Sequence, residues 1–539
     1  MSHIPTTHRA IQIVGVDEIV VATDKPVDAV GPHQVLLQVE ACGICFSDTK
    51  LLHAFDTHPR KAEVQSGIDL AALAEIPSYK PGTLPTVPGH EPVGRIVAVG
   101  EAVTHFRVGE RVLVQADWKH LRTATSNGAF GYNFEGGLQE YVLIDERCAV
   151  SPSGEEFLIR VSDGPSAAAV GLIEPWATVE GSYAWAERNH VAAGGRLLVV
   201  ADAEATGLDA LTSEHQPAET LELDSTGAAA LRDGGFDDIV YYGADADLIE
   251  HLAGLLGTRG VMCVVLGGAT VSRRVALDVG RVHYDFIRFC GTTGHHPADG
   301  YAWIPATGEL REGDKVAVIG AAGPMGQMHL MRAVTSGVAG ITVTGTDLND
   351  ERLANLRAIV APAAGRHGVP LQVINSARTP LQPGYTHLSC MVPVPAVVAQ
   401  AVDLAADGAI LNAFAGIPAG TTADLDLQGI IERRVFMLGT SGSDVSDMRT
   451  VLRKIEQGVL DTQISLDAVT GMAGFRDAID SVVNRTSGGK IMVYPMLADL
   501  PLTRLADMAE RLPHVAAKLR DGIWTKDAEQ ALLAGGGAA

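Results

Sequence analysis

The stretch K-V-A-V-I-G-A-A-G-P-M-G occupies residues 315–326 and decides the fold expected for the centre of this chain. Its first half is a short apolar run rich in Val, which is typical of a buried strand in a parallel sheet. Its second half is a turn of small residues that lets the backbone and the next helix N-terminus approach a pyrophosphate. The stretch therefore predicts a doubly wound α/β domain with a bound dinucleotide. We expect the cofactor to contact the residues of the turn, Gly320, Ala321, Gly323, Pro324, Met325 and Gly326.

A second predicted strand, I-T-V-T-G-T-D at residues 341–347, ends in Asp347. An acid about 20 residues beyond a dinucleotide turn hydrogen-bonds the ribose 2′-hydroxyl. A carboxylate at this position also repels a 2′-phosphate, so Asp347 favours NAD over NADP. The alternative is that Asp347 only caps the helix expected in the following segment, N-D-E-R-L.

An internal repeat indicates two α/β modules in tandem. Y-A-W at residues 183–185 recurs at 301–303, and a predicted strand follows each copy. Residues 264–294 align with 412–442 without a gap and share six identities over 31 positions. Chance similarity remains the alternative, because six identities are few. The matching Y-A-W segments and the identical strand order favour duplication.

The first copy lacks the nucleotide chemistry of the second. Its strand runs into A-D-A-E-A-T-G at residues 201–207, which places Asp202 and Glu204 where a phosphate would bind. Two carboxylates repel a pyrophosphate. We therefore expect this copy to bind no dinucleotide and to serve packing, substrate closure or assembly.

Three short segments predict a metal centre: A-C-G-I-C-F-S-D at 41–48, V-P-G-H-E-P-V-G at 87–94 and G-L-I-E-P-W-A at 171–177. They offer one thiolate, one imidazole and two carboxylates, a mixed donor set that suits a zinc ion with an open position. The expected metal ligands are Cys45, His90, Glu91 and Glu174. A simpler explanation exists for each residue alone, since a lone cysteine is most often a small buried apolar residue. A polarising metal with a dinucleotide turn implies hydride transfer between an alcohol and a nicotinamide.

Other polar residues lie close to these ligands in the sequence. Ser47 is the expected proton acceptor for a substrate alcohol, with a local turn hydrogen bond as the alternative. Asp48 is expected to orient His90, with a helix cap as the alternative. Lys50 is expected to be solvated, with an anionic substrate group as the alternative partner. Cys42 is the rival thiolate, although core filling fits it better. The expected catalytic residues are Ser47, Cys45, His90 and Glu91.

The composition bounds the class of protein and its partners. The chain has 539 residues, a hydrophobic fraction of 47% and a formal net charge of −23. No basic stripe offsets this charge, which argues against a nucleic-acid or anionic-membrane partner. The apolar runs are only strand-length, and residues 1–10 do not read as a signal peptide. Six cysteines do not make a disulfide framework, so we expect a cytoplasmic protein with a small-molecule substrate.

Together these segments resemble the zinc-dependent medium-chain dehydrogenase/reductase superfamily over residues 8–178 and about 301–495. The resemblance implies a GroES-like β domain that holds the metal and an inserted Rossmann domain, after which the chain returns to the β domain. Ser47 matches the family's proton-relay hydroxyl. The residues that match the zinc ligands of the polyol and threonine dehydrogenase branch are Cys45, His90, Glu91 and Glu174. Short phrases such as G-G-K-I-M-V-Y at 488–494 are closer to the sugar-phosphate reductase branch.

The chain departs from this family in four ways. No run of four cysteines stands near residues 115–135, so one catalytic zinc ion and no structural zinc is expected. Lys50 occupies the position where many members have a relay histidine. The stretch between Cys45 and His90 is longer than usual. An extra, partial Rossmann-like module lies at about 185–300.

The expected fold class is α/β plus β, in which a GroES-like β domain is joined to a Rossmann doubly wound parallel sheet and a tandem degenerate Rossmann-like module. The expected parts are a GroES-like catalytic domain at 1–180, the degenerate module at 181–300, the NAD-binding domain at 301–455, a return segment at 456–495 and a helical tail at 496–539. We expect the last six residues, A-G-G-G-A-A, to be disordered.

The sequence as a whole favours a zinc- and NAD-dependent dehydrogenase of a secondary alcohol or its ketone, of the polyol, sugar or sugar-phosphate type. One alternative is a zinc-free reductase of activated double bonds. Another is a nucleotide-sensing or scaffold protein without turnover. The resemblance also implies a homo-oligomer, either a dimer or a tetramer.

Overall fold

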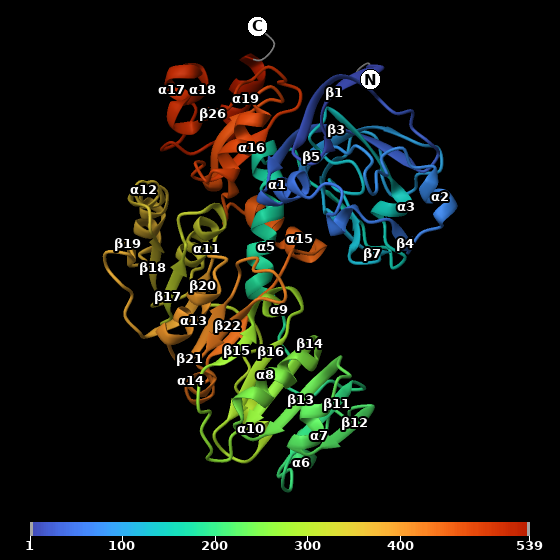
Figure 1. The fold of residues 1–539 in the computed structure, drawn as a ribbon. Helices are drawn as coiled ribbons and strands as arrows, with labels where there is room; N and C mark the ends of the chain where they lie inside the picture. The colour runs from blue at the N-terminus through green and yellow to red at the C-terminus, as the bar shows by residue number, and fades with distance from the viewer. Residues whose placement is uncertain (1–3, 536–539) are drawn as a thin grey trace. The chain divides into compact units, whose positions relative to one another are not determined.

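The computed structural model describes residues 4–535. Its contacts divide the chain into two compact units (Figure 1). Unit 1 consists of Met1–Thr178 and Ser443–Ala539, and unit 2 of Val179–Gly442. Helix α15 (Val445–Glu456) therefore belongs to unit 1, whereas the sequence placed these residues at the end of the NAD-binding domain. Ala534 and Gly535 are helical rather than disordered, and the rest of the expected disorder falls outside the described residues.

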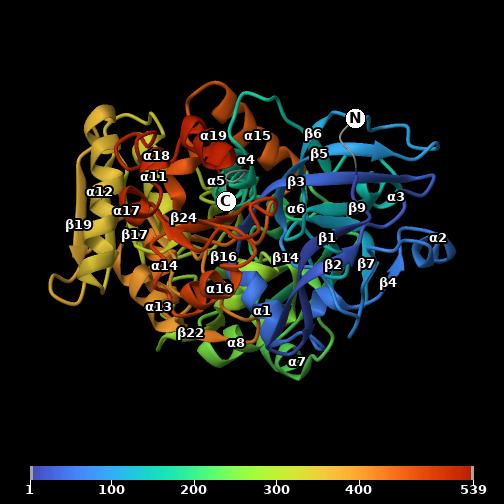
Figure 2. The ribbon, with the colours of Figure 1, turned by 90° about the horizontal axis from the view of Figure 1, so that it is seen from above.

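Unit 1 is built on a mixed sheet of eight strands in the order β10-β6-β5-β3-β25-β24-β26, with β9 also pairing with β3. Figure 2 shows the long strand β3 beside β5 and β9. The antiparallel pairing of β3 with β5 and of β5 with β6 confirms the β-rich pattern expected for this part of the chain. The strands are β3 (Gln34–Ile44), β5 (Glu91–Val99), β6 (Arg111–Val114), β9 (Tyr141–Asp145), β10 (Leu158–Arg160), β24 (Leu466–Thr470), β25 (Lys490–Val493) and β26 (Thr503–Arg504).

Smaller sheets and short helices complete unit 1. Strands β1 (Thr7–Gly15) and β2 (Glu18–Pro26) form a hairpin, and β4 (Val64–Ser66), β7 (Asp117–Thr123) and β8 (Asn127–Ala129) form a three-stranded sheet. In the region without cysteines, the rings of Trp118 and Phe134 pack 4.7 Å apart. The helices are α1 (Phe46–His53), α2 (Leu70–Ala74), α3 (Glu146–Ala149), α4 (Ala167–Gly171), α15, α16 (Phe475–Val483), α17 (Met508–Arg511), α18 (Pro513–Ala516) and α19 (Lys526–Gly535), with α5 (Ile173–Ala184) leading into unit 2.

The register of the large sheet brings three distant segments together. Gly43 near the end of β3 pairs with Glu91, the first residue of β5. On the other side of β3, Ile44 pairs with Ile491 of β25. Because both partners run antiparallel to β3, the residue that follows β3 lies beside the start of both neighbours. This convergence positions the candidate site.

Unit 2 contains two parallel sheets in tandem, which confirms the expected Rossmann-like architecture (Figure 1). The first module has the strand order β12-β11-β13-β14-β16. Its elements are β11 (Arg196–Ala201), α6 (Leu208–Thr212), β12 (Glu219–Leu223), α7 (Ser225–Ala230), β13 (Phe236–Tyr242), α8 (Ala246–Leu255), β14 (Leu256–Val265), β15 (Val275–Asp278), α9 (Val279–Tyr284), β16 (Arg288–Thr292) and α10 (Pro297–Tyr301).

The second module has the strand order β19-β18-β17-β20-β21-β23, and its β22 pairs with β15 of the first module. The apolar run 315–319 forms β17, a central strand, as its composition predicts. The elements are β17 (Lys315–Ile319), α11 (Pro324–Thr335), β18 (Thr342–Asp347), α12 (Asp350–His367), β19 (Leu371–Asn375), β20 (Tyr385–Cys390), α13 (Pro395–Leu404), β21 (Ala405–Asn412), β22 (Thr422–Leu425), α14 (Leu427–Arg433) and β23 (Phe436–Leu438).

Within residues 4–535, no helix has both the length and the apolar character needed to cross a bilayer. The expected helical tail contains α17, α18 and α19. Helix α19 is tied to the body of unit 1 by Glu529, whose buried carboxylate accepts hydrogen bonds from the N–H groups of Ala167 and Ala168 at 2.6 and 2.9 Å. The Tyr494 hydroxyl donates to the same carboxylate at 2.8 Å. The tail thus satisfies the N-terminal donors of α4.

Replacing Glu529 with Ala is expected to loosen α4, because two buried N–H donors lose a charged acceptor. Each hydrogen bond to a charged group contributes about 1.5–3 kcal/mol to stability. Hydrogen–deuterium exchange should therefore show faster exchange in peptides covering Ala167 and Ala168. Glu510→Ala, which removes an exposed acid of the same tail, is the control. Equal protection in the two variants would contradict this role for Glu529.

Candidate active site

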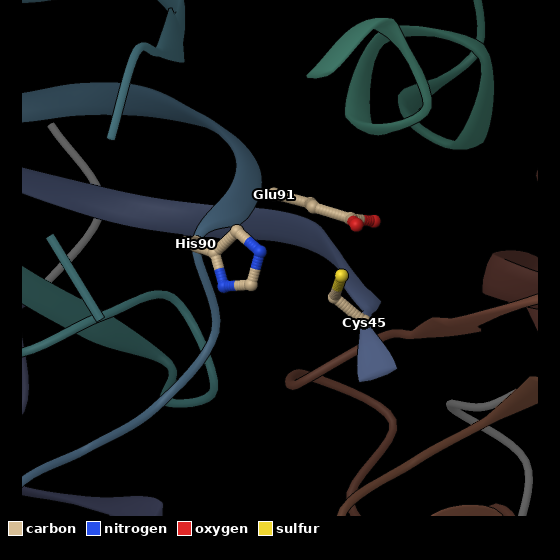
Figure 3. A group of neighbouring side chains, drawn as sticks. All are labelled: Cys45, His90 and Glu91. Atoms are coloured by element: carbon tan, nitrogen blue, oxygen red, sulfur yellow. The ribbon is translucent and has the colours of Figure 1, made fainter. Parts of the chain in front are cut away.

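The candidate metal centre lies where the ends of β3 and β5 meet (Figure 3). Cys45 follows β3 at the N-cap position of α1, while His90 directly precedes β5 and Glu91 begins it. One ligand atom from each of these three side chains lies within 4.8 Å of the other two. Figure 3 shows the thiol, the imidazole and the carboxylate directed toward a common space. The structure thus brings together three of the four predicted ligands.

The imidazole of His90 is held on both sides by the first turn of α1. Its Nδ1 lies 3.2 Å from Oδ1 of Asp48, and its Nε2 lies 3.2 Å from the Ser47 hydroxyl. The other oxygen of Asp48 accepts a hydrogen bond from the Cys45 N–H at 2.8 Å. Asp48 is therefore placed both to orient His90, the expected role, and to cap α1, the alternative to it. Since Asp48 occupies Nδ1, Nε2 is the nitrogen left for a metal ion.

Charges around His90 favour a proton on the ring when no metal is bound. Burial opposes the charged ring, but Tyr132 and Asp48 raise the pKa of His90 well above its ordinary value. A metal ligand must be the neutral imidazole. Metal binding at this site must therefore release a proton, and the metal affinity must fall as the pH is lowered.

Glu91 divides its carboxylate between a cation of the protein and the candidate metal position. Its side chain is fully buried, and Oε1 accepts a hydrogen bond from the Lys490 ammonium at 2.5 Å. Burial opposes the charge on Lys490, but Glu91, Cys45 and Glu174 raise its pKa. Oε2 of Glu91 is buried and has no hydrogen-bond partner within residues 4–535. This oxygen is therefore available to a cation.

Glu174, the fourth predicted ligand, lies near the start of α5 and is not part of the three-residue cluster. Burial raises the pKa of its carboxyl to about 7. The charge of Glu91 also raises this pKa, whereas His90 and Lys490 lower it. Glu174 is therefore close enough to the centre to interact electrostatically with its residues. The structure does not bring it into the ligand cluster that the sequence predicted.

The cluster fits a zinc ion both chemically and energetically. Thiolate, imidazole and carboxylate are all zinc ligands, and three protein ligands leave a fourth position open for substrate. A buried carboxylate oxygen without a partner is costly, and a cation near Oε2 of Glu91 would remove this cost. The residues that would hold the ion are Cys45, His90 and Glu91.

Two further expectations concern the neighbours of these ligands. The thiol of Cys42 is fully buried and donates a weak hydrogen bond to the Gly43 carbonyl at 3.6 Å. Burial raises its pKa well above the ordinary value, so Cys42 fills the core, whereas Cys45 is the cysteine of the candidate cluster. The side chain of Lys50 is exposed, with its ammonium 5.8 Å from the centre of the Phe46 ring.

Sequence reasoning missed Lys490, Tyr132 and Arg60. The ring of Tyr132 is buried 5.6 Å from that of His90, and the Arg60 guanidinium lies 5.1 Å from the centre of the Tyr132 ring. Arg60 also pairs with Asp117 at 2.8 Å. The one sequence signal for Lys490 was a lysine opening the apolar strand K-I-M-V. Tyr132 lies in a turn and Arg60 in the short 3₁₀ helix η1 (Pro59–Lys61), and the sequence of neither segment gives such a signal.

The dinucleotide turn has the geometry that its glycines predict. Gly320 has a left-handed backbone, with φ of +82°. A Cβ built on Gly326 would lie 2.4 Å from the Gly320 carbonyl oxygen, so only glycine lets α11 approach β17 this closely. Gly323 occupies the N-cap position of α11, followed by Pro324, and a Cβ there would lie 3.3 Å from the end of the Arg352 side chain and 4.0 Å from the Gly320 carbonyl oxygen. The N-terminus of α11 is therefore open to an anion.

Asp347 ends β18, the strand next to the turn. Its Oδ1 accepts hydrogen bonds from the N–H groups of Leu348 and Asn349 at 2.8 and 3.3 Å, and its Oδ2 lies 3.8 Å from Arg352. The helix-cap alternative for Asp347 is wrong, because Asn349 caps α12 by accepting from the Arg352 N–H at 3.0 Å. Arg352, which the sequence did not single out, thus stands between Asp347 and Gly323.

The corresponding turn of the first module is built differently. Asp202 accepts hydrogen bonds from the N–H and the hydroxyl of Ser225 at 2.8 and 2.6 Å. The helix after this turn, α6, has five residues, compared with 12 in α11. A carboxylate therefore occupies the end of β11, and no long helix points its N-terminus at this position.

Comparisons with known proteins show which proteins this chain resembles. The alcohol dehydrogenase GroES-like domain matches residues 31–153. Mannitol-1-phosphate 5-dehydrogenase of Aliivibrio fischeri is 27% identical over 247 residues, covering 42% of this chain and 57% of that protein. (R,R)-butanediol dehydrogenase of Bacillus subtilis is 28% identical over 251 residues, covering 41% of this chain and 61% of that protein. The chain thus spans less than two thirds of the length of these relatives.

The solved structure of 2R,3R-butanediol dehydrogenase from Bacillus subtilis aligns with a TM-score of 0.51 and 17% sequence identity. The alignment covers 91% of this chain and 100% of that one, and at this identity it shows the fold alone. The match to the GroES-like domain, the parallel Rossmann-like sheets and the similarity to alcohol and polyol dehydrogenases support the resemblance to the medium-chain dehydrogenase/reductase superfamily.

Proposed function

We propose that this protein is a zinc- and NAD-dependent dehydrogenase that interconverts a secondary alcohol and its ketone, with a polyol, sugar or sugar phosphate as substrate. The observation that carries the proposal is the approach of ligand atoms from Cys45, His90 and Glu91 to within 4.8 Å. The relatives named as mannitol-1-phosphate and butanediol dehydrogenases support the reaction and the substrate class.

In the proposed reaction, a substrate C–H bond gives a hydride to NAD while the O–H bond gives up a proton, so that ketone, NADH and a proton result. A bound zinc ion would polarise the substrate oxygen and lower its proton affinity. The Ser47 hydroxyl, 3.2 Å from Nε2 of His90, is the group that would accept the proton. Asp48 fixes the imidazole, and Lys490 neutralises one oxygen of Glu91.

The choice of NAD rests on the second module of unit 2. The open N-terminus of α11 supports pyrophosphate binding at the turn from Gly320 to Gly326. The carboxylate of Asp347 ends the adjacent strand, where it would bind a ribose hydroxyl and disfavour a 2′-phosphate. Arg352 moderates this preference because it partly neutralises Asp347.

The purified chain is expected to contain one zinc ion, and Cys45→Ala should lose it because the thiolate is the softest of the three ligands. Cys42→Ala is the matched control, since it removes the other thiol of the same segment. Elemental analysis with a protein assay measures both. The proposed site would be contradicted if Cys45→Ala retained its zinc or if only Cys42→Ala lost it. An active wild-type enzyme without metal would instead favour the reductase of activated double bonds.

Removing the Ser47 hydroxyl is expected to slow NAD-dependent alcohol oxidation by about 100-fold or more, the usual range for loss of a proton-transfer group. Ser47→Ala should keep its zinc, whereas Ser47→Thr, which retains a hydroxyl, should keep much of the rate. Steady-state kinetics on a panel of polyols makes the measurement. A wild-type rate in Ser47→Ala would exclude the assigned role, and no turnover by the zinc-loaded wild type would favour a nucleotide sensor.

Asp347→Ala is expected to reduce the preference for NAD over NADP by about tenfold or more. The lost hydrogen bond involves a charged group, which contributes about 1.5–3 kcal/mol, and 1.4 kcal/mol corresponds to a factor of ten. Titration with NADH and NADPH, followed by nicotinamide fluorescence, measures the ratio of affinities. Asp350→Ala removes a neighbouring acid of equal charge and should leave the ratio unchanged. The cofactor assignment fails if both variants keep the wild-type ratio.

A further inference from the structure

The two α/β modules of unit 2 repeat each other element by element in their second halves. Asp278 and Asp426 stand 148 residues apart (426 − 278) and cap equivalent helices, accepting from Arg281 and Gly429 N–H groups at 3.0 and 2.9 Å. The same offset relates the first residues of β16 and β23. The equivalent element pairs are β13 and β20, α8 and α13, β14 and β21, β15 and β22, α9 and α14, and β16 and β23.

Backbone geometry repeats at the same offset. Phe286 and Arg434, again 148 apart (434 − 286), both have a left-handed backbone, with φ of 57° and 55°. A bulky side chain rarely adopts this conformation. Its recurrence at equivalent positions supports duplication over chance similarity, the alternative left open by the sequence.

The two modules pair with each other through equivalent strands. Strands β15 and β22 are antiparallel, and Val275, Ala276 and Leu277 face Leu425, Asp424 and Ala423 in turn. At an offset of 148, Asp424 is the equivalent of Ala276, so this position faces its own counterpart. Val275 faces the equivalent of Leu277, and Leu277 faces the equivalent of Val275. A two-fold axis between identical subunits produces this exchange of roles.

A second contact obeys the same symmetry. A Cβ built on Gly291 would lie 2.8 Å from Cδ1 of Ile431, and one built on Gly439 would lie 2.9 Å from Cα of His283. Gly439 is the equivalent of Gly291, and Ile431 is the equivalent of His283. The contact between these two positions therefore occurs twice, with the modules exchanged.

A third pair of equivalent contacts obeys the same symmetry, and one of its two members is a hydrogen bond. The N–H of Val271 donates to the Gln428 side chain at 3.0 Å, and a Cβ built on Gly280 would lie 2.8 Å from Cα of Ala419. Gln428 is the equivalent of Gly280, and Ala419 is the equivalent of Val271. Three independent contacts thus define one pseudo-two-fold axis within unit 2.

Apolar side chains from both modules fill this contact. Leu277, Val279 and Ile287 of the first module belong to the same buried cluster as Leu427 and Ile431 of the second. A continuous apolar core is characteristic of permanent rather than transient interfaces. The first module has kept the strands and helices that build this contact, whereas its nucleotide half has a shorter helix after the first strand and no counterpart of β19.

The charged residues at this contact favour pairing between the two different modules over pairing between two copies of the second module. Two copies of the second module would place Asp424 opposite Asp424, and like charges directly opposite in a strand pair are destabilising. In this chain Ala276 faces Asp424 instead. Arg274 of the first module pairs with Asp403 of the second at 2.8 Å. The equivalent of Arg274 is Thr422, which cannot form that ion pair.

We propose that the first module acts as a built-in second subunit. It occupies, from within the same chain, the surface on which a second copy of the dinucleotide-binding module would otherwise dock, so this surface is closed to other chains. Any self-association of the protein must then use a different surface. The proposal is independent of the catalytic activity proposed above.

The test uses the full chain with Ala276→Cys and Asp424→Cys, treated with a short-span bismaleimide. The expected product migrates as one chain at every protein concentration, and its digest contains a peptide that joins positions 276 and 424. Each single variant, treated alike, controls for the native thiols. A covalent dimer of the double variant, or a digest without the joined peptide, would overturn the proposal.

A charge exchange tests the symmetry itself. Ala276→Asp places an acid opposite Asp424 and should lower the melting temperature of unit 2 by about 2 °C at low salt. The double variant Ala276→Asp with Asp424→Ala swaps the two residues across the pseudo-axis and should recover that loss. Ala276→Asn controls for side-chain size. A double variant no more stable than Ala276→Asp would show that the two positions are not equivalent.

Discussion

A buried carboxylate between Lys490 and the candidate metal position holds the candidate site together. Glu91 is fully removed from solvent, with one oxygen bound to Lys490 and the other directed at the space beside Cys45 and His90. A buried charge is tolerated only when it is paired. The strand that carries Lys490 must therefore lie beside β3, although some 400 residues of sequence separate Lys490 from Glu91 (490 − 91). Lys490 balances the negative charge of Glu91, and a zinc ion held by Cys45, His90 and Glu91 would supply the further positive charge that a bound thiolate needs.

Much of this arrangement could be predicted from the sequence because its signals are local. The apolar run before Gly320 and the small residues after it fix a strand, a turn and a helix within 12 positions. Alternating apolar residues predict the strands of unit 1, since one face of each strand must be buried. The segments around Cys45 and His90 are informative because a thiol, an imidazole and a carboxylate in combination have few roles other than binding a metal ion.

The remaining features depend on tertiary contacts that local patterns do not encode. Lys490 reads as the polar start of an apolar strand, and only the pairing of β25 with β3 shows that it meets Glu91. Glu174 has the right chemistry, yet the start of α5 holds it outside the cluster. The repeat at offset 148 is visible in the sequence, but the exchange of roles between Ala276 and Asp424 appears only in the strand register.

X-ray absorption at the zinc edge of the purified wild-type protein tests the central claim most directly, because it reports the atoms bound to the metal. The account predicts one sulfur at about 2.3 Å, from Cys45, together with nitrogen and oxygen ligands at about 2.0–2.2 Å that include a single imidazole. A zinc ion bound by several sulfurs, or by none, would contradict the assignment of Cys45, His90 and Glu91 as its ligands.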